Sequence, residues 1–580
     1  MDTHSFTSML RRAHLPVMAA LQGVLILWMV HHGFRTWGGH YIGIAGDSSI
    51  YLWFLSWWGW ALSHGHSLAY TRLVTYPWGN NVLWDTGVPL VFAPLSLAMH
   101  ARLMSLSLAY NLADFGGWWF SSIAAYWSYY RITRRRVASA LGSFLLLSSA
   151  YFTNQSLGHV DLMWVGFAFI LFAAVFDYVQ RERPAHWLLW RFVALSLCLW
   201  LTNEEYFVTT QMMIAFGLLF WIRWAFRRGQ WNGKRILGIL RGYGASLVAT
   251  GLALAPEVWW QLRTPAQPFR PFTYFNLYQV NLANLFVPIH TWWHYGRGVL
   301  LTGNTMEQDG FLGVIFLSGL VVFGIVTRRT RRLEQSALTA WIVWFFILAM
   351  GDFLLWTAKA NTHIPLPGVL FVFIPILRSI VLGRFMWGVF WGLGLLASLY
   401  FRQLASRRLK ALFVFWIGAV LASWWPGPYP VSRTEPNTWI SAAVRGREIS
   451  PGEVLLEFPF DIAFNPKNNV LETQIANHFT YRLAEGYLTT NDANMAHFDA
   501  LITYWVAIQD YGPHAAATRY YQSQLKSPGA AFRHFLRTTH PGLVVLTSMP
   551  HEAAMKAWLD SQLGPPSGEQ SKTFWWSLKR

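Results

Sequence analysis

Hydrophobic residues are grouped into long runs along the first three quarters of the chain. About eleven of these runs have the roughly 17–25 residues that a helix needs to cross the apolar core of a bilayer. The segment 87–104 is also apolar, but it carries His100 and Arg102 and two prolines, so we expect a re-entrant or interfacial helix there. The pattern predicts an all-α polytopic membrane domain with about eleven transmembrane helices. The predicted spans are residues 14–33, 108–130, 137–156, 163–180, 187–203, 207–226, 237–257, 310–327, 337–354, 385–401 and 411–426.

Basic residues are clustered between alternate runs. With eleven spans, every cluster falls on the same side of the membrane as the N-terminus, which is the cytoplasmic side by the positive-inside rule. A twelfth span at 87–104 would break this regularity. We therefore expect a cytoplasmic N-terminus. The clusters are Arg11 and Arg12; Arg131 and Arg134 to Arg136; Arg181 and Arg183; Arg227, Arg228, Lys234 and Arg235; Arg328, Arg329, Arg331 and Arg332; and Arg402, Arg407, Arg408 and Lys410.

The pattern changes after Pro426, where the long apolar runs stop. The stretch PGPYPVSRTEP has the prolines of an extended linker. Beyond it, EVLLEFPF and GLVVLTSMP resemble strands, and 493–539 has a helical pattern. We expect a small extracytoplasmic α/β domain at 427–580, following a membrane domain at 1–426.

Composition and charge agree with this class. Of the 580 residues, 54% are hydrophobic and 12% are charged, as in an integral membrane protein. The net charge of +18 does not indicate nucleic acid, because membrane orientation explains the arginine clusters. The single Cys198 allows no intramolecular disulfide and no cysteine-based metal site. No Walker-type motif supports ATP-driven chemistry.

The loop from Phe34 to about Asp85 carries a carboxylate among many aromatic residues. It reads GIAGDSSIYLWFLSWWGWALSHGHS and then TYPWGNNVLW. Aromatic residues favour the membrane interface, so we expect interfacial helices in this large outer loop. A carboxylate kept there is costly, which indicates that Asp47 is functional; alternatively, it could cap a helix that begins at Ser48 or Ser49. Trp78 is a candidate substrate-binding residue, although interfacial tryptophans are more often anchors.

Other polar residues fall on the same predicted side. His159 and Asp161 stand in GHVD, Glu204 and Glu205 in TNEEYF, and Glu307 in NTMEQDG. Each has a structural alternative: a cap for Asp161, an interfacial position for His159, and solvent exposure for Glu307. The adjacent glutamates could be a solvated pair. They point about 100° apart on a helix, so we expect only one of them in a cleft.

Two arginines on the outer side, Arg378 and Arg384, stand in ILRSIVLGRF. Arginine is disfavoured on the outer flank and binds phosphate through paired hydrogen bonds, so both are candidate phosphate ligands; contact with lipid headgroups is the alternative. Carboxylates with arginines suit the transfer of a group from a lipid phosphate, in which one carboxylate acts as general base. Carboxylates could also hold a divalent cation such as Mg²⁺ or Mn²⁺.

The motifs GDSSIYLW after the first span and GHVD after the third resemble those of the GT-C membrane glycosyltransferases. This likeness covers about the first 205 residues. It implies a polyprenyl-phosphate sugar donor used on the non-cytoplasmic side, with Asp47 as the first-loop catalytic acid and Asp161 as the second-loop acid. The chain departs from better-known relatives in having Ser48 and Ser49 after Asp47, and a lone Asp161, instead of further carboxylates. These departures weaken the case for an obligatory metal ion.

Motifs along most of the chain, including LTNEEYF, EQDGFLGV, LRSIVLGRF and VLLEFPFD, resemble a group of bacterial membrane proteins classed as GT-C-like. The resemblance implies a glycosyltransferase of the bacterial inner membrane that acts on a cell-envelope glycan, lipid or protein acceptor. Two other functions remain. A transporter or flippase for lipid-linked saccharides would predict internal pseudo-symmetry and matching broken spans, which we do not find. An assembly protein could keep the GT-C scaffold without activity.

Overall fold

The computed structural model describes most of the chain as two compact units. The helical unit comprises Met1–Trp37, Asn111–Pro256 and Pro271–Val431, and the mixed unit comprises Gly38–Tyr110, Glu257–Arg270 and Ser432–Arg580. The described residues are 14–83, 87–181, 183–227, 229, 232–263, 278–294, 305–307, 309–328, 333–357, 360–374, 377, 380–460, 469–486 and 498–578.

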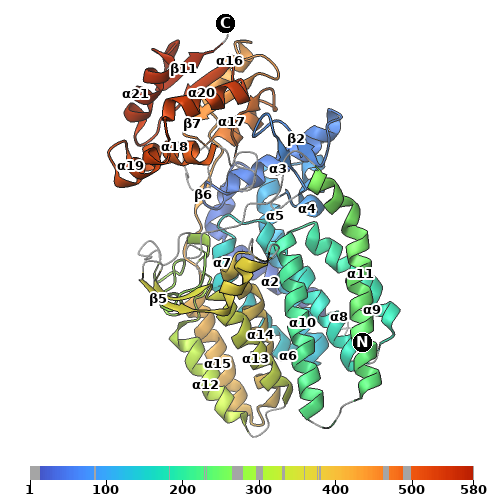
Figure 1. Ribbon diagram of the computed structural model, residues 1–580. Coiled ribbons are helices and arrows are strands. Elements are labelled where there is room, and N and C mark those ends of the chain that lie inside the picture. The colour runs from blue at the N-terminus through green and yellow to red at the C-terminus, as the bar shows by residue number, and fades with distance from the viewer. Residues whose placement is uncertain are drawn as a thin grey trace. The chain divides into compact units, whose positions relative to one another are not determined.

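Helices account for the architecture of the helical unit (Figure 1). Each predicted hydrophobic run contains a helix, because a helix satisfies the backbone polar groups of an apolar segment internally. The run 137–156 is divided: α6 ends before Ser148, and the extended backbone of Ser149 precedes α7. The helices are α2 (His14–Met29), α5 (Leu106–Thr133), α6 (Arg136–Leu147), α7 (Ala150–Gln155), α8 (Gly166–Arg181), α9 (Ala185–Trp200), α10 (Glu204–Arg227), α11 (Gly233–Arg263), α12 (Gly313–Val326), α13 (Leu333–Ala349), α14 (Met386–Gln403) and α15 (Arg407–Trp424).

The number of membrane crossings stays a prediction. In the described part of the chain, four helices are both long and apolar enough to cross a membrane: 161–181, 204–227, 233–260 and 382–403. Several others are apolar but shorter, among them α2, α9, α12 and most of α13. The protein is therefore mostly helical with apolar helices, and the count of about eleven spans is not established.

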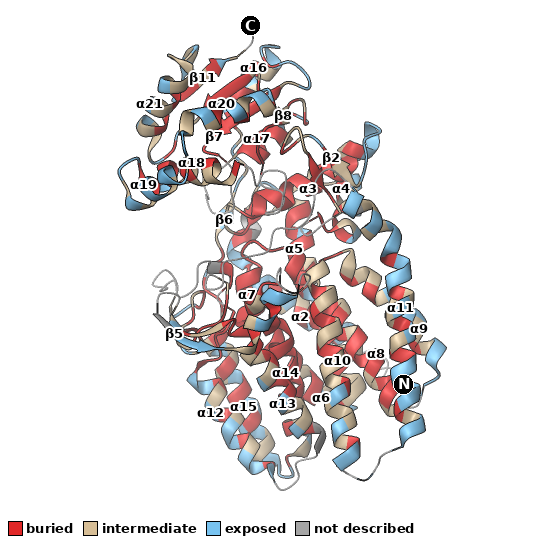
Figure 2. Ribbon diagram, in the orientation of Figure 1, coloured by how far each residue is buried: buried red, intermediate tan, exposed pale blue. Residues whose placement is uncertain are grey.

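Helix α14 lies at the centre of the helical unit, as its buried residues in Figure 2 indicate. Its apolar window is 83% buried, whereas that of α11 is 28% buried. Small residues bring α14 close to α6: a Cβ added at Gly142 would lie 2.3 Å from the carbonyl oxygen of Gly394. Glycine permits this close approach of two helix backbones.

Short elements connect the helices of this unit. The hairpin of β4 (Phe353–Thr357) and β5 (Ala360–Pro365) is antiparallel. The short 3₁₀ helices are η1 (His31–Thr36), η3 (Asp161–Trp164), η4 (Ala283–Leu285), η5 (Thr305–Glu307), η7 (Pro367–Phe373) and η9 (Leu382–Phe385).

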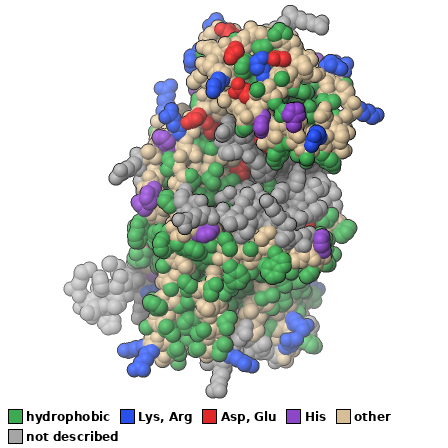
Figure 3. Space-filling view, turned by 90° about the vertical axis from the view of Figure 1, so that its left-hand side faces the viewer, with side chains coloured by type: hydrophobic (Ala, Val, Ile, Leu, Met, Phe, Trp, Pro, Cys, Tyr) green, Lys and Arg blue, Asp and Glu red, His purple; other side chains and the backbone are tan. Residues whose placement is uncertain are grey.

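Lys and Arg side chains gather at the lower end of the face drawn in Figure 3, below a region covered by hydrophobic side chains.

The mixed unit contains a five-stranded sheet of order β10-β11-β9-β7-β8. Strands β7, β8 and β9 are parallel, and β10 and β11 add antiparallel neighbours at the β9 edge. The two predicted strands are confirmed as β7 and β9, and three helices lie within the predicted helical region 493–539. The strands are β7 (Val454–Phe458), β8 (Arg482–Leu483), β9 (Leu543–Leu546), β10 (Gly568–Gln570) and β11 (Thr573–Ser577), and the helices are α16 (Thr438–Arg445), α17 (Val470–Ala476), α18 (Asp499–Tyr511), α19 (Ala516–Ser523), α20 (Pro528–Thr539) and α21 (Glu552–Leu563).

Much of the first loop belongs to the same mixed unit. It forms α3 (Ser48–Ser63) and the short strands β1 (Tyr41–Ile42), β2 (Tyr70–Thr71) and β3 (Asn80–Asn81). The apolar segment 87–104 forms α4 (Pro89–His100), and β6 (Val431–Ser432) follows the last helix of the helical unit. Within the mixed unit, the Thr75 backbone N–H donates to the Glu485 carbonyl oxygen at 2.8 Å. Trp53 Nε1 donates to Gln474 Oε1 at 2.7 Å. The predicted division into domains at 1–426 and 427–580 stays a prediction.

Candidate functional site

The guanidinium of Arg384 is held between two carboxylates in the helical unit. Its Nη1 lies 2.8 Å from Glu205 Oε2. Its Nε and Nη2 donate to Glu307 Oε1 at 3.1 and 2.9 Å. The preceding residue fixes the backbone, because Gly383 donates its N–H to the Tyr278 carbonyl oxygen, and a Cβ at Gly383 would lie 2.3 Å from that oxygen. A side chain at residue 383 would therefore displace Arg384.

Glu205 occupies the first turn of α10, where the unpaired N–H groups of a helix favour negative charge. Its Oε1 accepts a hydrogen bond from the Val381 N–H at 3.1 Å, while Oε2 faces Arg384. Glu205 thus joins the start of α10 to the segment before α14. Glu204 is half-buried at the first position of the same helix.

Gln155, the last residue of α7, joins two buried carboxyl groups. Its Nε2 donates to Asp309 Oδ2 at 2.6 Å and to Glu307 Oε2 at 3.3 Å. Asp309 and Glu307 are 0% and 1% exposed. The turn that carries Asp309 is fixed by Gly310, whose N–H donates to Asn284 Oδ1 at 2.8 Å.

The two buried carboxyls have opposite pKa shifts. Burial raises the pKa of Asp309 well above its ordinary value, and the nearby charge of Glu307 raises it further. Burial also acts to raise the pKa of Glu307, but the positive charges of Arg384 and His159 outweigh it and lower that pKa. Asp309 therefore holds a proton under conditions in which Glu307 is ionised.

His159 and Asp161, from the GHVD motif, lie in the same region. His159 Nδ1 lies 2.5 Å from Gln155 Oε1 and 3.9 Å from Glu307 Oε1. Asp161 is the first residue of η3, and its Oδ2 accepts from Asn203 Nδ2 at 2.6 Å. Its negative charge also stabilises the positive charge of the Arg384 guanidinium. We use the name acidic cluster for Asp161, Glu205, Glu307 and Asp309 together with Arg384, His159 and Gln155.

The remaining predicted site residues lie elsewhere. Asp47 is in the mixed unit at the N-cap position of α3, 9% exposed, and its side chain makes no capping hydrogen bond. Trp78, in the same unit, is half-buried. Its ring centre lies 5.8 Å from that of Phe498, and it packs against the hydrophobic core around the five-stranded sheet. Arg378 lies outside the described residues.

The helical unit thus brings together Glu205, Glu307, Arg384, His159 and Asp161, whereas Asp47 and Trp78 belong to the mixed unit. The functional roles of all these residues stay predictions. Sequence reasoning did not select Asp309, Gln155 or Asn203. Asp309 lies two residues after Glu307 in the same NTMEQDG run, and Gln155 lies one helical turn before His159. Their closeness in the sequence to Glu307 and His159 could have indicated both residues.

A divalent cation needs several oxygen ligands around one point. In the ranges that the structure describes, no group of three or more His, Asp or Glu side chains is arranged to hold a metal ion. In the acidic cluster, Arg384 already supplies the positive charge that faces Glu205 and Glu307. The described donor set does not fit a metal centre.

Comparison with known proteins identifies the family. Residues 19–422 match the family described as "Domain of unknown function (DUF6311)", and because this match spans well over half of the chain, the chain belongs to that family. No protein with a curated description matches the sequence.

Several solved structures are similar at low identity. AglB, an archaeal oligosaccharyltransferase from Archaeoglobus fulgidus solved with an inhibitory peptide and a dolichol-phosphate, has 9% identity and a TM-score of 0.46, covering 93% of this chain and 70% of that chain. ArnT from Cupriavidus metallidurans, bound to undecaprenyl phosphate, has 11% identity and a TM-score of 0.46, covering 99% and 98%. The arabinofuranosyltransferase AftD from Mycobacteria has 13% identity and a TM-score of 0.49, covering 98% of this chain and 40% of that chain.

Proposed function

We propose that this member of the DUF6311 family is a membrane glycosyltransferase of the GT-C type. It transfers a sugar from a polyprenyl-phosphate donor to an acceptor on the extracytoplasmic face of the bacterial inner membrane. The observation that carries the proposal is the position of Arg384, held between Glu205 and Glu307 at the start of a helix whose last turn carries the basic Arg402. A guanidinium binds phosphate through paired hydrogen bonds, and neighbouring carboxylates can accept hydrogen bonds from sugar hydroxyls. This group of residues, at the end of the helix away from Arg402, therefore suits a phosphate-linked sugar.

The exposure of the two ion pairs indicates how the donor phosphate would reach Arg384. The side chain of Glu307 is 1% exposed, whereas those of Glu205 and Arg384 are 13% and 16% exposed. We assign Glu307 the role of orienting the guanidinium from the buried side. The phosphate would contact Nη1 from the more open side, where Glu205 lies. Arg378 is a second candidate ligand for the phosphate.

The transfer itself requires a base and a stabilised leaving group. The acceptor hydroxyl oxygen bonds to the anomeric carbon of the sugar while the bond from that carbon to the phosphate oxygen breaks. The hydroxyl proton passes to the Asp47 carboxylate, as the first-loop motif implies. The polyprenyl phosphate leaves with the negative charge, which the Arg384 guanidinium stabilises.

The remaining polar residues would recognise the sugar. Asp161 and one of the glutamates at the start of α10 are hydrogen-bond acceptors for sugar hydroxyls. Asp309, when protonated, can both donate and accept. His159 and Trp78 are further candidates for contact with the substrate. No step in this scheme passes through a metal ion, because the described donor set does not fit one.

The proposal is tested by sugar transfer from radiolabelled polyprenyl-phosphate donors in membranes that contain the wild type, Asp47→Asn or Asp161→Asn at equal protein level. We expect transfer by the wild type, a loss of more than about a hundredfold in Asp47→Asn because a general base is removed, and a smaller loss in Asp161→Asn. Full transfer by Asp47→Asn would remove the assigned base. A wild type that moves the intact donor across vesicle membranes without transfer would instead support the transporter function.

A further inference from the structure

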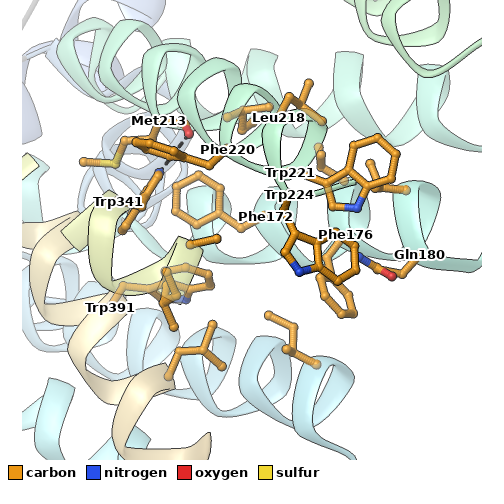
Figure 4. Close-up of a pocket in the computed structure, with 18 of the residues that line it drawn as sticks. Phe172, Phe176, Gln180, Met213, Leu218, Phe220, Trp221, Trp224, Trp341 and Trp391 are labelled. Atoms are coloured by element: carbon orange, nitrogen blue, oxygen red, sulfur yellow. Dashed lines mark hydrogen bonds between the residues drawn. The ribbon is translucent and has the colours of Figure 1, made fainter. Parts of the chain in front are cut away.

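A pocket lies inside the helical unit, lined by α5, α8, α10, α13 and α14, and has a volume of about 250 Å³. Figure 4 shows Trp341 and Trp391 at one side of it and Gln180 at the opposite side. Trp341 is fixed by a hydrogen bond of 3.0 Å from its Nε1 to the Met213 carbonyl oxygen. Apart from Gln180 and Arg402, the lining consists of apolar and aromatic side chains and one glycine.

The pocket lies towards one end of the helices that form it. It is lined by residues of α8 from Phe172 to Gln180 and of α10 from Met213 to Trp224. Helix α14 contributes residues from Trp391, the sixth of its 18, to Arg402 near its end. The lining begins at Met213, eight residues after Glu205, and at Trp391, seven residues after Arg384, which is about 10–12 Å along each helix. No residue of the acidic cluster lines the pocket, and Arg402 lies 18 residues after Arg384, or about 27 Å further along the helix.

This end of the unit is basic. The last turns of α5, α8, α10 and α14 carry Arg131, Arg181, Arg227 and Arg402, and Arg402 lines the pocket directly. Arg131 and Arg181 are already paired with the buried Asp177. Arg402 is exposed, so its guanidinium is positioned for an anionic group at the mouth of an apolar pocket.

We propose that this pocket binds an acyl chain of an anionic phospholipid, whose phosphate is held by Arg402. An apolar cavity between membrane helices takes a hydrocarbon chain, and a basic residue at its mouth selects a negative headgroup. Trp221 and Trp224 line the same region, and tryptophan favours the headgroup level of a bilayer. The site would thus hold the lipid headgroup at the opposite end of α14 from Arg384.

The glycine in the lining provides a direct test. A Cβ added at Gly217 would meet only Trp341 Nε1, at 4.0 Å, so a larger side chain can enter the pocket without displacing backbone. Gly251 of α11 is the matched control, because it is exposed, does not line the pocket, and has no atom within 4 Å of an added Cβ. For the charge, Arg402→Gln is compared with Arg191→Gln, an exposed arginine on α9 that does not line the pocket.

The experiment is native mass spectrometry of the purified full chain in detergent, with phosphatidylglycerol and phosphatidylethanolamine at equal concentration. We expect the wild type to retain phosphatidylglycerol preferentially, Gly217→Leu to lose it, and Gly251→Leu to keep it. Arg402→Gln should bind about fivefold more weakly, as expected for one basic group near a headgroup, while Arg191→Gln should not change. Equal retention of both lipids, or retention unchanged in Gly217→Leu and Arg402→Gln, would overturn the proposal. Displacement of phosphatidylglycerol from this pocket by polyprenyl phosphate would also overturn it, since the occupant would then be the carrier lipid.

Discussion

Gln155 Nε2 donates a hydrogen bond of 2.6 Å to Asp309 Oδ2, and so joins the end of α7 to the turn before α12. The same amide reaches Glu307, and its oxygen lies beside His159. An amide can donate and accept at once, so this one side chain connects a neutral carboxyl, a charged carboxylate and an imidazole. The chemistry of the acidic cluster thus depends on a residue that carries no charge.

Asp309→Asn should stabilise the protein at alkaline pH. The folded-state pKa of Asp309 is raised by burial and by Glu307. Its contribution to stability is therefore fully present below the ordinary carboxyl pKa of about 3.9 and is lost as pH rises through the raised value. Asparagine remains neutral and still accepts from Gln155. We expect the Tm of the variant, measured in detergent, to fall less than that of the wild type as pH rises; parallel curves would contradict the assigned protonation.

A second pH effect is expected in the mixed unit. Burial raises the pKa of Glu472 from 4.5 to about 7, and the charge of Glu435 adds to the shift while the Glu435 N–H opposes it. Stability from protonated Glu472 is present below about pH 4.5 and is lost as pH rises through about 7, by about 3 kcal/mol in total. Glu472→Gln should remove this loss, because glutamine still accepts the Glu435 N–H bond of 2.8 Å.

The measurement for Glu472 is chemical unfolding followed by tryptophan fluorescence at several pH values. The exposed Glu569→Gln is the control, and we expect it to follow the wild type. If the free energy of unfolding of Glu472→Gln declined between pH 5 and 8 as steeply as that of the wild type, a buried, protonated Glu472 would be excluded.

Gly142→Ala should separate α6 from α14. An added Cβ at Gly142 would lie 2.3 Å from the Gly394 carbonyl oxygen and 2.2 Å from Ser398 Oγ. We expect a loss of about 1–3 kcal/mol from overpacking, although alanine otherwise favours helices. The matched Gly251→Ala has open space around it and should be neutral or slightly stabilising. A Tm for Gly142→Ala equal to or above that of Gly251→Ala would contradict the close approach.

The positions of the helices could be predicted from the sequence because the hydrophobicity of a run of residues is a local property. The break at Ser148 and Ser149 was not predicted, since serine side chains compete for backbone hydrogen bonds only in particular turns. The pairing of Thr75 with Glu485 also could not be read from the pattern. It joins backbone groups that are far apart in the chain, and no side-chain periodicity marks such a partner.

Some residues of the acidic cluster could also be selected from the local sequence. Glu205, Glu307 and Arg384 are charged residues next to apolar helices, where charge is costly without a role. Asp309 resembles an ordinary turn residue, and Gln155 an ordinary residue at a helix end. Their importance depends on which oxygen and nitrogen atoms the folded loops bring within 2.6–3.3 Å, which the linear sequence does not specify.

The most direct test of the account is whether the donor lipid depends on Arg384. Binding of polyprenyl phosphate to the purified chain is measured by native mass spectrometry for the wild type, Arg384→Lys, Arg384→Gln and the control Arg191→Gln. Arg384→Lys keeps a positive charge beside Glu205 and Glu307 but loses the forked donors, so it should fold and bind at least about tenfold more weakly. Arg384→Gln should also lower the Tm, because the buried Glu307 and the partly exposed Glu205 lose their partner. Wild-type affinity in a folded Arg384→Lys variant would contradict the assignment of Arg384 as the phosphate ligand.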